Sequence, residues 1–350
     1  MQIVYISKRP EVAAETLGHV AGLMPFVTQA VVVCPSALKD RFRAPAPPEL
    51  VVLDEAAVLG GRRAAFEAAS DHQLRNWLLR ASLAGCGEID DEFIMSDDDS
   101  RPLVEVRGDL YREAGRHHSY YFYHLAKWRP RATDYDLGQH RTRALLEGAG
   151  LPTLSYSSHM PQIVSKRILA ETAAWFEEES GGGLLPVDEW SLYFNYARRR
   201  HPGLFHPPRP FRTLCWPALP TDWEYDVRPP AFEFENFYPH LYQEDAIFAG
   251  IPRRFDAREQ ASRTRLKVAR RQQLQRIYDS PRARARRKAA WLARRALLRC
   301  RAVLDRHGAW GRRLERVAPA AWRRLARDLL LHGEDPAWSF PRPRRRRGGR

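Results

Sequence analysis

Three consecutive aspartates, Asp97, Asp98 and Asp99, are the residues whose type and spacing point most directly to chemistry. Carboxylates this close repel one another and raise each other's pKa, so such a run is costly unless a cation neutralises it. Mg²⁺ and Mn²⁺ take carboxylate oxygens and often complete their coordination with substrate phosphates. A metal ion held there would stabilise the charge that builds on a diphosphate leaving group. The alternative is a solvated loop or helix cap with no catalytic role.

The position of these aspartates favours the metal-binding interpretation. A short apolar run, Glu92 to Met95, leads directly into them and is typical of a strand. In open α/β sheets, ligands bind beyond the carboxyl ends of the strands. Within the candidate set of three, we expect Asp97 and Asp99 to contact Mg²⁺ or Mn²⁺, because alternate residues of an extended chain point the same way.

The elements that position this cluster follow from apolar patterning in the first half of the chain. Strands are predicted over residues 3–6, 30–34, 50–53 and 92–95, and helices over 11–23 and around Leu74, Trp77, Leu78 and Ala81. Such alternation predicts βαβ units and an α/β fold with a mixed, mostly parallel sheet. Further helices are expected over 136–147, from about Pro161 onward, and over 187–196.

Net charge separates the chain into two parts. Residues 251–350 hold 31 Lys and Arg against 8 Asp and Glu, whereas residues 1–250 hold 26 against 34. We therefore expect a catalytic domain over 1–250, a basic α-helical extension over 251–335 and a disordered basic tail over 336–350. The extension has three open interpretations: helices lying on an anionic membrane surface, a plain solvated extension, or nucleic-acid binding, which the acidic body disfavours.

The chain contains neither a run of about 18 apolar residues nor a pattern typical of a secretory signal, so the expected compartment is the cytoplasm. The basic extension would allow a peripheral place on the inner face of the cytoplasmic membrane. The four cysteines lie far apart and form no CxxC pair, so no cysteine-based zinc site is predicted. Without GxGxxG or GxxxxGK[ST], neither a Rossmann cofactor nor a P-loop has motif support.

Two segments resemble a known family. Residues 71–103 (DHQLRNWLLRASLAGCGEIDDEFIMSDDDSRPL) and 157–176 (SSHMPQIVSKRILAETAAWF) are similar to signature regions of the Stealth family of sugar-phosphate transferases for microbial surface polysaccharides. The resemblance covers residues 50–200 and implies a GT-A-like fold, with Asp98 and Asp99 at the family's aspartate positions. It implies a nucleotide-sugar donor, expected to be a UDP-sugar, and a glycan or lipid-linked acceptor. The opening IVYISKRP lacks the family's first motif, which leaves ordinary GT-A glycosyl transfer open.

Candidate catalytic residues lie outside the aspartates. The resemblance implies a role for His159 at a phosphate or as acid or base, and a structural role for this loop histidine is the alternative. Asp188 and Glu189 are candidate bases for an acceptor hydroxyl, or simply the acidic first turn of a helix. Candidate contacts to the nucleotide, each with an exposed or structural alternative, are Lys8, Arg9, Arg75, Asn76, Arg101, Lys166 and Arg167. His117, His118 and residues 120–124 line an acceptor groove or belong to the core.

Two functions of different classes therefore follow from the sequence. The first is a metal-dependent transferase that uses a nucleotide-sugar donor, by glycosyl or sugar-1-phosphate transfer, in surface polysaccharide or glycoconjugate synthesis. The second is a catalytically degenerate GT-A-like protein that binds glycan or serves as a scaffold.

Overall fold

The structure, a computed structural model, describes residues 1–44, 47–127, 134–214 and 231–278, with a few isolated positions between 280 and 292. The chain divides into two units, which are described separately. The first comprises Met1–Trp216, Trp223–Pro239 and Pro252–Thr264, and the second Pro217–Asp222, His240–Ile251 and Arg265–Arg350. The domain boundary expected at residue 250 stays a prediction.

A five-stranded sheet forms the centre of the first unit. Its strand order is β11-β4-β1-β2-β3. The bounds are β1 Gln2–Ile6, β2 Gln29–Cys34, β3 Glu49–Asp54, β4 Glu92–Asp97 and β11 Gln162–Ser165. Strands β4, β1, β2 and β3 are parallel, and β11 runs antiparallel to β4. The predicted α/β fold with a mixed, mostly parallel sheet is confirmed.

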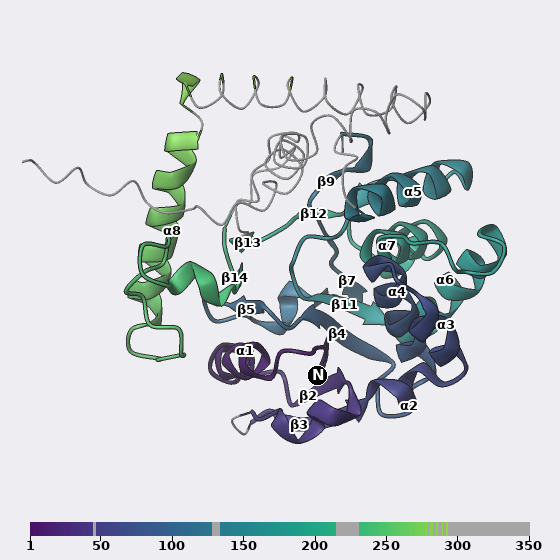
Figure 1. Ribbon diagram of the computed structural model, residues 1–350, viewed down its shortest axis with the longest axis horizontal. Coiled ribbons are helices and arrows are strands. Elements are labelled where there is room, and N and C mark those ends of the chain that lie inside the picture. Colours follow the sequence, from purple (N-terminus) through teal and green to yellow (C-terminus); the bar gives the residue numbers. More distant parts are fainter. Residues whose placement is uncertain are drawn as a thin grey trace, which may run out of the picture. The chain divides into compact units, whose positions relative to one another are not determined.

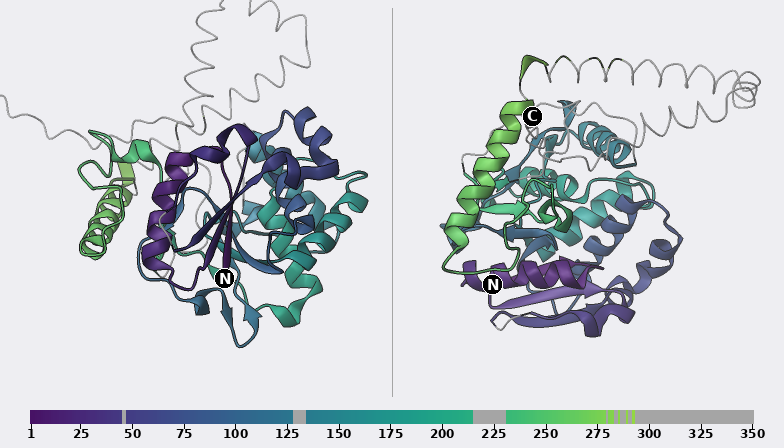
Figure 2. Two further views of the ribbon diagram at one scale, coloured as in Figure 1. Left: turned by 90° about the horizontal axis from the view of Figure 1, so that it is seen from below. Right: turned by 60° about the vertical axis from the view of Figure 1, so that its left-hand side comes forward.

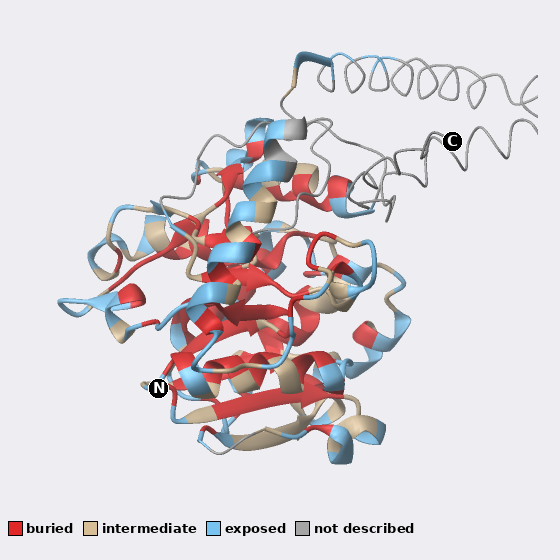
Figure 3. Ribbon diagram, turned by 90° about the vertical axis from the view of Figure 1, so that its left-hand side faces the viewer, coloured by how far each residue is buried: buried red, intermediate tan, exposed pale blue. Residues whose placement is uncertain are grey.

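Helices cover both faces of this sheet (Figures 1 and 2). Helix α1 (Pro10–Leu23) lies on one face, and α4 (His72–Ser82), α6 (Lys166–Glu179) and α7 (Glu189–Arg200) lie on the other. Alternate strand residues enter two separate cores. Tyr5 packs in the core that contains Leu17 of α1, and Val4 packs in the core that contains Trp77 of α4. Burial on both faces explains why β1, β2 and β4 are continuous apolar runs, whereas edge strand β3 is only half-buried (Figure 3).

The strand order reverses between β1 and β4. From β1 the chain moves outward through β2 to β3 and then returns to pair β4 with the other side of β1. At such a reversal the connecting helices diverge to opposite faces, and the carboxyl ends of the two strands are the usual place for a ligand. The residues that follow β1, from Ser7 to Arg9, and the residues that close β4, from Asp97 to Asp99, meet at this point.

The helix expected from about Pro161 begins later than predicted. Residues 162–165 form β11, paired with β4 so that Ile163 lies opposite Ile94, and the helix begins at Lys166. Both Ile163 and Val164 are buried and β-branched, and pairing with the free edge of β4 satisfies their backbone groups, which a helix start would leave unpaired. The other expected helices appear as α1, α4, α5 (Asp134–Gly148) and α7.

Short elements complete the first unit. The helical ones are η1 Ser36–Arg41, α2 Glu55–Leu59, η2 Gly60–Arg62, α3 Arg63–Ala68, η3 Leu83–Gly85, η4 Gly108–Leu110, η5 Leu125–Lys127 and η6 Pro202–Leu204. The strands are β5 Ser100–Pro102, β6 Arg112–Glu113, β7 Arg116–His117, β8 Tyr120–Tyr121, β9 Tyr123–His124, β10 Leu154–Ser155, β12 Arg209–Pro210, β13 Thr213–Leu214 and β14 Phe234–Asn236. They form a three-stranded sheet, β13-β14-β5, and the pairs β10-β9, β12-β8 and β6-β7.

The basic region is described only in its first part. Helix α8 (Gln260–Tyr278) begins in the first unit and continues into the second, where η7 (Pro239–Tyr242) ends. Within the second unit Arg270 Nη1 donates to the carbonyl oxygens of Ile247 and Ala249, at 3.1 and 2.7 Å. No helix among the described residues has the length and apolar character needed to cross a membrane. The predicted helices after residue 292 and the tail lie outside the described residues, so their membrane role stays a prediction.

The close approach of α4 and α5 gives a test of the packing. A Cβ atom added at Gly138 of α5 would lie 1.4 Å from Oε1 of the buried Gln73 side chain on α4. We predict that Gly138→Ala lowers the free energy of unfolding by about 1–3 kcal/mol, because Gln73 has to leave its place. Chemical denaturation measures the change.

Gly148→Ala is the matched control, since a Cβ there meets nothing within 4 Å at the exposed end of the same helix. The control should be neutral or more stable by up to about 1 kcal/mol. Equal stabilities of the two variants would contradict the described packing of α4 on α5.

Candidate functional site

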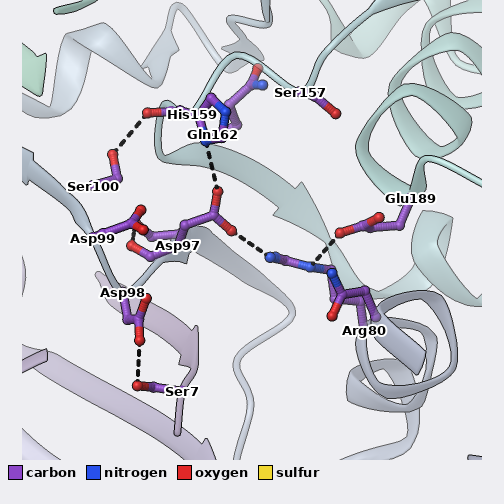
Figure 4. Close-up of polar contacts among 12 residues, drawn as sticks. Ser7, Arg80, Asp97, Asp98, Asp99, Ser100, Ser157, His159, Gln162 and Glu189 are labelled. Atoms are coloured by element: carbon purple, nitrogen blue, oxygen red, sulfur yellow. Dashed lines mark hydrogen bonds and ion pairs between the residues drawn. The ribbon is translucent and has the colours of Figure 1, made fainter. Parts of the chain in front are cut away.

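The site begins at Asp97, the last residue of β4 (Figure 4). Its Oδ1 accepts a hydrogen bond of 2.6 Å from Arg80 Nη2, and its Oδ2 lies 3.7 Å from His159 Nδ1. Burial alone would raise the pKa of Asp97, but the contact with His159 and the charge of Arg80 outweigh it and hold that pKa below its ordinary value. Asp97 is therefore a permanent carboxylate at the carboxyl end of the sheet.

Arg80 links this carboxylate to a second one. Its side chain is only 7% exposed, its Nε lies 3.1 Å from Oε1 of Glu189, and its guanidinium stacks 4.6 Å from the Trp190 ring. The sequence reasoning missed Arg80. Its signal was an arginine three residues after Trp77, inside the apolar stripe of α4, where a charged side chain needs a buried partner.

Asp98 faces the end of β1 rather than the other two aspartates. Its carboxylate accepts from Ser7 Oγ at 2.5 Å and from both Nε and Nη2 of Arg9, and its backbone oxygen accepts from Thr16 of α1 at 2.6 Å. Both carboxylate oxygens are thus engaged in fixing the loop between β1 and α1. Asp97 and Asp99 remain the candidate metal ligands.

Asp99 is the second carboxyl group suited to a cation. Its Oδ2 accepts from Arg9 Nη2 at 2.8 Å, and in the part of the chain that the structure describes no hydrogen bond reaches its Oδ1. Burial and the negative charge of Asp97 raise the pKa of Asp99, and Arg9 opposes them only in part. The carboxylate form of Asp99 is therefore disfavoured, and a cation between Asp97 and Asp99 would stabilise it.

These two side chains fit a hard divalent ion that is completed by phosphate oxygens. They offer carboxylate oxygens, the donors that Mg²⁺ and Mn²⁺ prefer. Asp97, Asp98, Asp99 and Glu189 supply four carboxyl groups, whereas Arg9, Arg80 and His159 supply three cationic groups. The site therefore holds no excess of positive charge that would repel a cation.

His159 has a backbone conformation that few non-glycine residues adopt. Its φ is +48°, and its carbonyl oxygen accepts hydrogen bonds from Ser100 Oγ at 3.0 Å and Thr213 Oγ1 at 3.1 Å. These bonds hold the strained backbone so that the imidazole faces Asp97. Desolvation acts to lower the pKa of His159, but the contact with Asp97 and its charge raise it above the ordinary value. The ring is thus favoured as a cation beside the aspartates.

The two acidic residues at the start of α7 have different roles. Asp188 caps the helix: it accepts from Ser191 N at 2.7 Å, from Gln139 Nε2 at 2.6 Å and from Ser157 Oγ. Glu189 instead faces Arg80. Burial raises the pKa of Glu189 to about 7, because Arg80 offsets only part of the effect. Of the two candidate bases, Glu189 has a pKa suited to a base, whereas Asp188 makes the contacts of a helix cap.

Two of the predicted nucleotide contacts converge on one ring. The Arg75 guanidinium lies 4.4 Å from the centroid of Phe66, and Lys8 Nζ lies 6.0 Å from it. Lys8 follows β1 and is exposed, so these cations stand beside the carboxyl end of the strand. Asn76, one residue further along α4, contacts His72 Nε2 at 3.2 Å.

The remaining predicted nucleotide contacts have structural partners. The Arg101 side chain is 0% exposed, with Nε 2.6 Å from Glu235 and its guanidinium 3.9 Å from the Phe237 ring. Lys166 Nζ donates to the backbone oxygens of Cys86 and Ile89, which closes the loop before β4. Arg167 pairs with Glu171 on the exposed side of α6. The contacts of Arg101, Lys166 and Arg167 are thus structural ones.

Most of the aromatic and histidine-rich stretch belongs to the core rather than to an acceptor groove, although Tyr121 is half-buried and His124 is exposed. His117, His118 and Tyr120 are 0% exposed, and Tyr123 is 1% exposed. Side chains buried to this degree do not line an open surface for a glycan.

Comparison with known proteins does not identify a family for this chain. No family model matches the chain, and no curated protein matches it. Among the solved structures that do match, mouse xyloside xylosyltransferase 1 in its apo form aligns with 68% of this chain and 97% of its own, at 12% identity and a TM-score of 0.41. Similarity at this level does not establish a family, and the resemblance to the Stealth family stays a prediction. The functional argument therefore rests on the residues of the site.

The raised pKa of Glu189 predicts a pH-dependent stability. The folded state keeps a proton on this carboxyl up to about pH 7, whereas the unfolded chain releases it near the ordinary pKa of 4.5. The free energy of unfolding of the wild type, relative to that of Glu189→Gln, should therefore fall as pH rises from 4.5 to 7, by ~3–4 kcal/mol in all, and stay constant above that window. Urea denaturation of both proteins at pH 5 and pH 8 measures the difference.

Glu179→Gln, at the exposed end of α6, is the control. Its free energy of unfolding should differ from that of the wild type by the same amount at both pH values. If the difference in free energy of unfolding between the wild type and Glu189→Gln does not change with pH, Glu189 is ionised throughout this window.

Proposed function

We propose that this chain is a metal-dependent transferase that takes a sugar, or a sugar 1-phosphate, from a nucleotide-sugar donor bound at the carboxyl ends of β1 and β4. The observation that carries the proposal is the meeting of Asp97 and Asp99 with cationic side chains from β1 and α4 at the point where strand order reverses. Carboxylates for a cation, with cationic side chains beside them, suit the binding of a diphosphate.

In this proposal Asp97 and Asp99 would hold Mg²⁺ or Mn²⁺, which when bound supplies positive charge to the diphosphate leaving group. Lys8 and Arg75, which both lie over the Phe66 ring, would contact the nucleotide part of the donor. The imidazolium of His159, held beside Asp97, adds positive charge at the same end of the sheet. Arg80 keeps Asp97 ionised and fixes its orientation, so it acts as a positioning residue.

Glu189 is the proposed base for the acceptor hydroxyl. A pKa of about 7 is suited to accepting a proton at neutral pH, and Arg80 orients the carboxylate that forms. If the acceptor oxygen attacks the anomeric carbon, a nucleoside diphosphate leaves. If it attacks the phosphorus nearest the sugar, a nucleoside monophosphate leaves. The nucleotide product distinguishes glycosyl from sugar-1-phosphate transfer, and a UDP-sugar is the first donor to test.

Calorimetric titration with UDP-, GDP- and CDP-sugars, with and without Mn²⁺, tests donor binding. We expect one donor to bind about tenfold or more tightly with Mn²⁺, which is ~1.4 kcal/mol or more, and Asp97→Asn/Asp99→Asn to lose this increment. The control is Asp90→Asn/Asp91→Asn, which makes the same charge change on exposed residues at the other end of β4. Binding that is equally tight without Mn²⁺ and in Asp97→Asn/Asp99→Asn would favour the degenerate, non-enzymatic alternative.

Glu189→Gln tests the assignment of the base. With the donor identified, kcat should fall by about 10²–10⁴ while donor affinity stays within a few-fold, because the carboxylate acts on the acceptor proton. Wild-type kcat should rise with pH through about 7, as Glu189 releases its proton. Initial rates from pH 5 to 9 for wild type, Glu189→Gln and Glu179→Gln measure this. Wild-type activity with no change across that window would exclude Glu189 as the base.

A further inference from the structure

Three ligating side chains lie together away from the proposed transferase site. Glu113 is on β6, His118 lies between β7 and β8, and His206 follows η6. Among the residues that the structure describes, these three each offer one donor atom, and all three atoms lie within 4.8 Å of one another. His118 is buried, His206 is half-buried and Glu113 is exposed, so the cluster has a fixed inner side and an open outer side.

Backbone contacts hold the three segments in place. Hairpin β6–β7 closes through Ala114 and Gly115, both with positive φ, as expected of a two-residue turn. The segment after η6 runs along the strand that leaves this hairpin: His206 N donates to the His117 oxygen at 2.9 Å, and Arg209 N donates to the Ser119 oxygen at 2.9 Å. The donor atoms are therefore brought together by the fold and not by chance contacts of free loops.

The distances suit one small ion. His118 Nε2 lies 3.2 Å from Glu113 Oε2, and two ligands of a tetrahedral ion with bonds of about 2.0–2.1 Å are separated by about 3.3 Å. His206 Nε2 lies 3.0 Å from the Glu113 backbone oxygen, so the tautomer that donates there leaves a lone pair on Nδ1. The His118 and His206 rings stack with their centroids 4.4 Å apart and an interplanar angle of 25°, so a ring has to turn for both lone pairs to meet one ion.

One cation beside the cluster opposes metal binding: Arg209 Nη2 lies 3.6 Å from Glu113 Oε2. Its side chain is 45% exposed, so the guanidinium can move into solvent when a cation occupies the cluster.

We propose that Glu113, His118 and His206 bind a divalent transition-metal ion of the Zn²⁺ class. Two imidazoles and one carboxylate form a donor set that favours Zn²⁺ over Mg²⁺, with water in the remaining position. This site is separate from the aspartates, because the two lie at opposite ends of β4. His117, beside His118, lies 2.9 Å from Glu92, the first residue of β4, whereas Asp97 is its last residue. The ion fastens hairpin β6–β7 to the segment after α7, and the inference does not depend on the proposed transferase activity.

The test uses the full chain without an affinity tag, stripped of metal with EDTA and titrated with Co²⁺ and then Zn²⁺. Co²⁺ should give the intense visible absorption of a four-coordinate site, and Zn²⁺ should displace it at one equivalent. Glu113→Gln and His206→Gln, which change less buried ligands than His118, should weaken Zn²⁺ binding by about 10–100-fold or more. Zn²⁺ should also raise the melting temperature of the wild type but not of these variants.

Three controls decide the location. His201→Gln removes another half-buried histidine, one that pairs with Glu171, and should leave binding unchanged. Arg209→Gln removes the opposing cation and should tighten binding. Asp97→Asn/Asp99→Asn should keep the Zn²⁺ site intact. The proposal would be overturned if folded wild-type protein bound neither Co²⁺ nor Zn²⁺. It would also be overturned if Glu113→Gln and His206→Gln both bound these ions as tightly as the wild type does.

Discussion

The rest of the site depends on how the carboxylates after β4 are neutralised. Asp97, Asp98 and Asp99 follow a buried strand, where unpaired charge is costly, and cations from separate elements reach them. Arg9 comes from the end of β1, Arg80 from α4 and His159 from the loop before β11. The charges fix the mutual positions of these elements, and the pKa values of Asp99 and Glu189 stay raised because burial outweighs the effect of the nearby cations.

The disfavoured ionisation of these two carboxyl groups links structure to the proposed chemistry. Arg80 is shared between Asp97 and Glu189, so a change at either carboxyl group alters the electrostatic environment of the other. An incoming cation would favour ionised Asp99 in the same way that Arg80 favours ionised Asp97. The site is therefore organised around charge that is ready to be balanced by ligand, rather than around a closed internal ion-pair network such as the one that surrounds buried Arg101.

The sequence predicted the fold well where a local pattern determines it. Continuous apolar runs identified β1, β2 and β4, because strands buried on both faces carry no polar alternation, and the apolar run Leu50 to Leu53 identified the half-buried edge strand β3. The aspartates stood out because they follow such a run. By contrast, β11 was read as helix, since residues 162–165 become a strand only by pairing with an edge of β4 that lies some 70 residues earlier in the chain. Tertiary pairing of this kind has no local signal.

Tertiary contacts also decide the roles of the candidate site residues. Glu189 and Asp188 are neighbours with the same chemistry in sequence, and only the fold shows that one caps α7 while the other meets Arg80. Charge and position, close after the aspartates for Arg101 and near a helix start for Lys166, predict anion contacts but cannot distinguish a ligand contact from a buried partner of Glu235 or of backbone oxygens. The cluster of Glu113, His118 and His206 joins residues 93 positions apart and has no recognisable spacing.

The most direct test of the central claim is a crystal structure of the chain with Mn²⁺ and UDP, with anomalous diffraction measured at the manganese absorption edge. The account predicts an anomalous peak between the carboxylates of Asp97 and Asp99, about 2.0–2.3 Å from an oxygen of each, with diphosphate oxygens completing the coordination. A structure in which UDP binds elsewhere, or binds at the ends of β1 and β4 with no manganese between these aspartates, would contradict it.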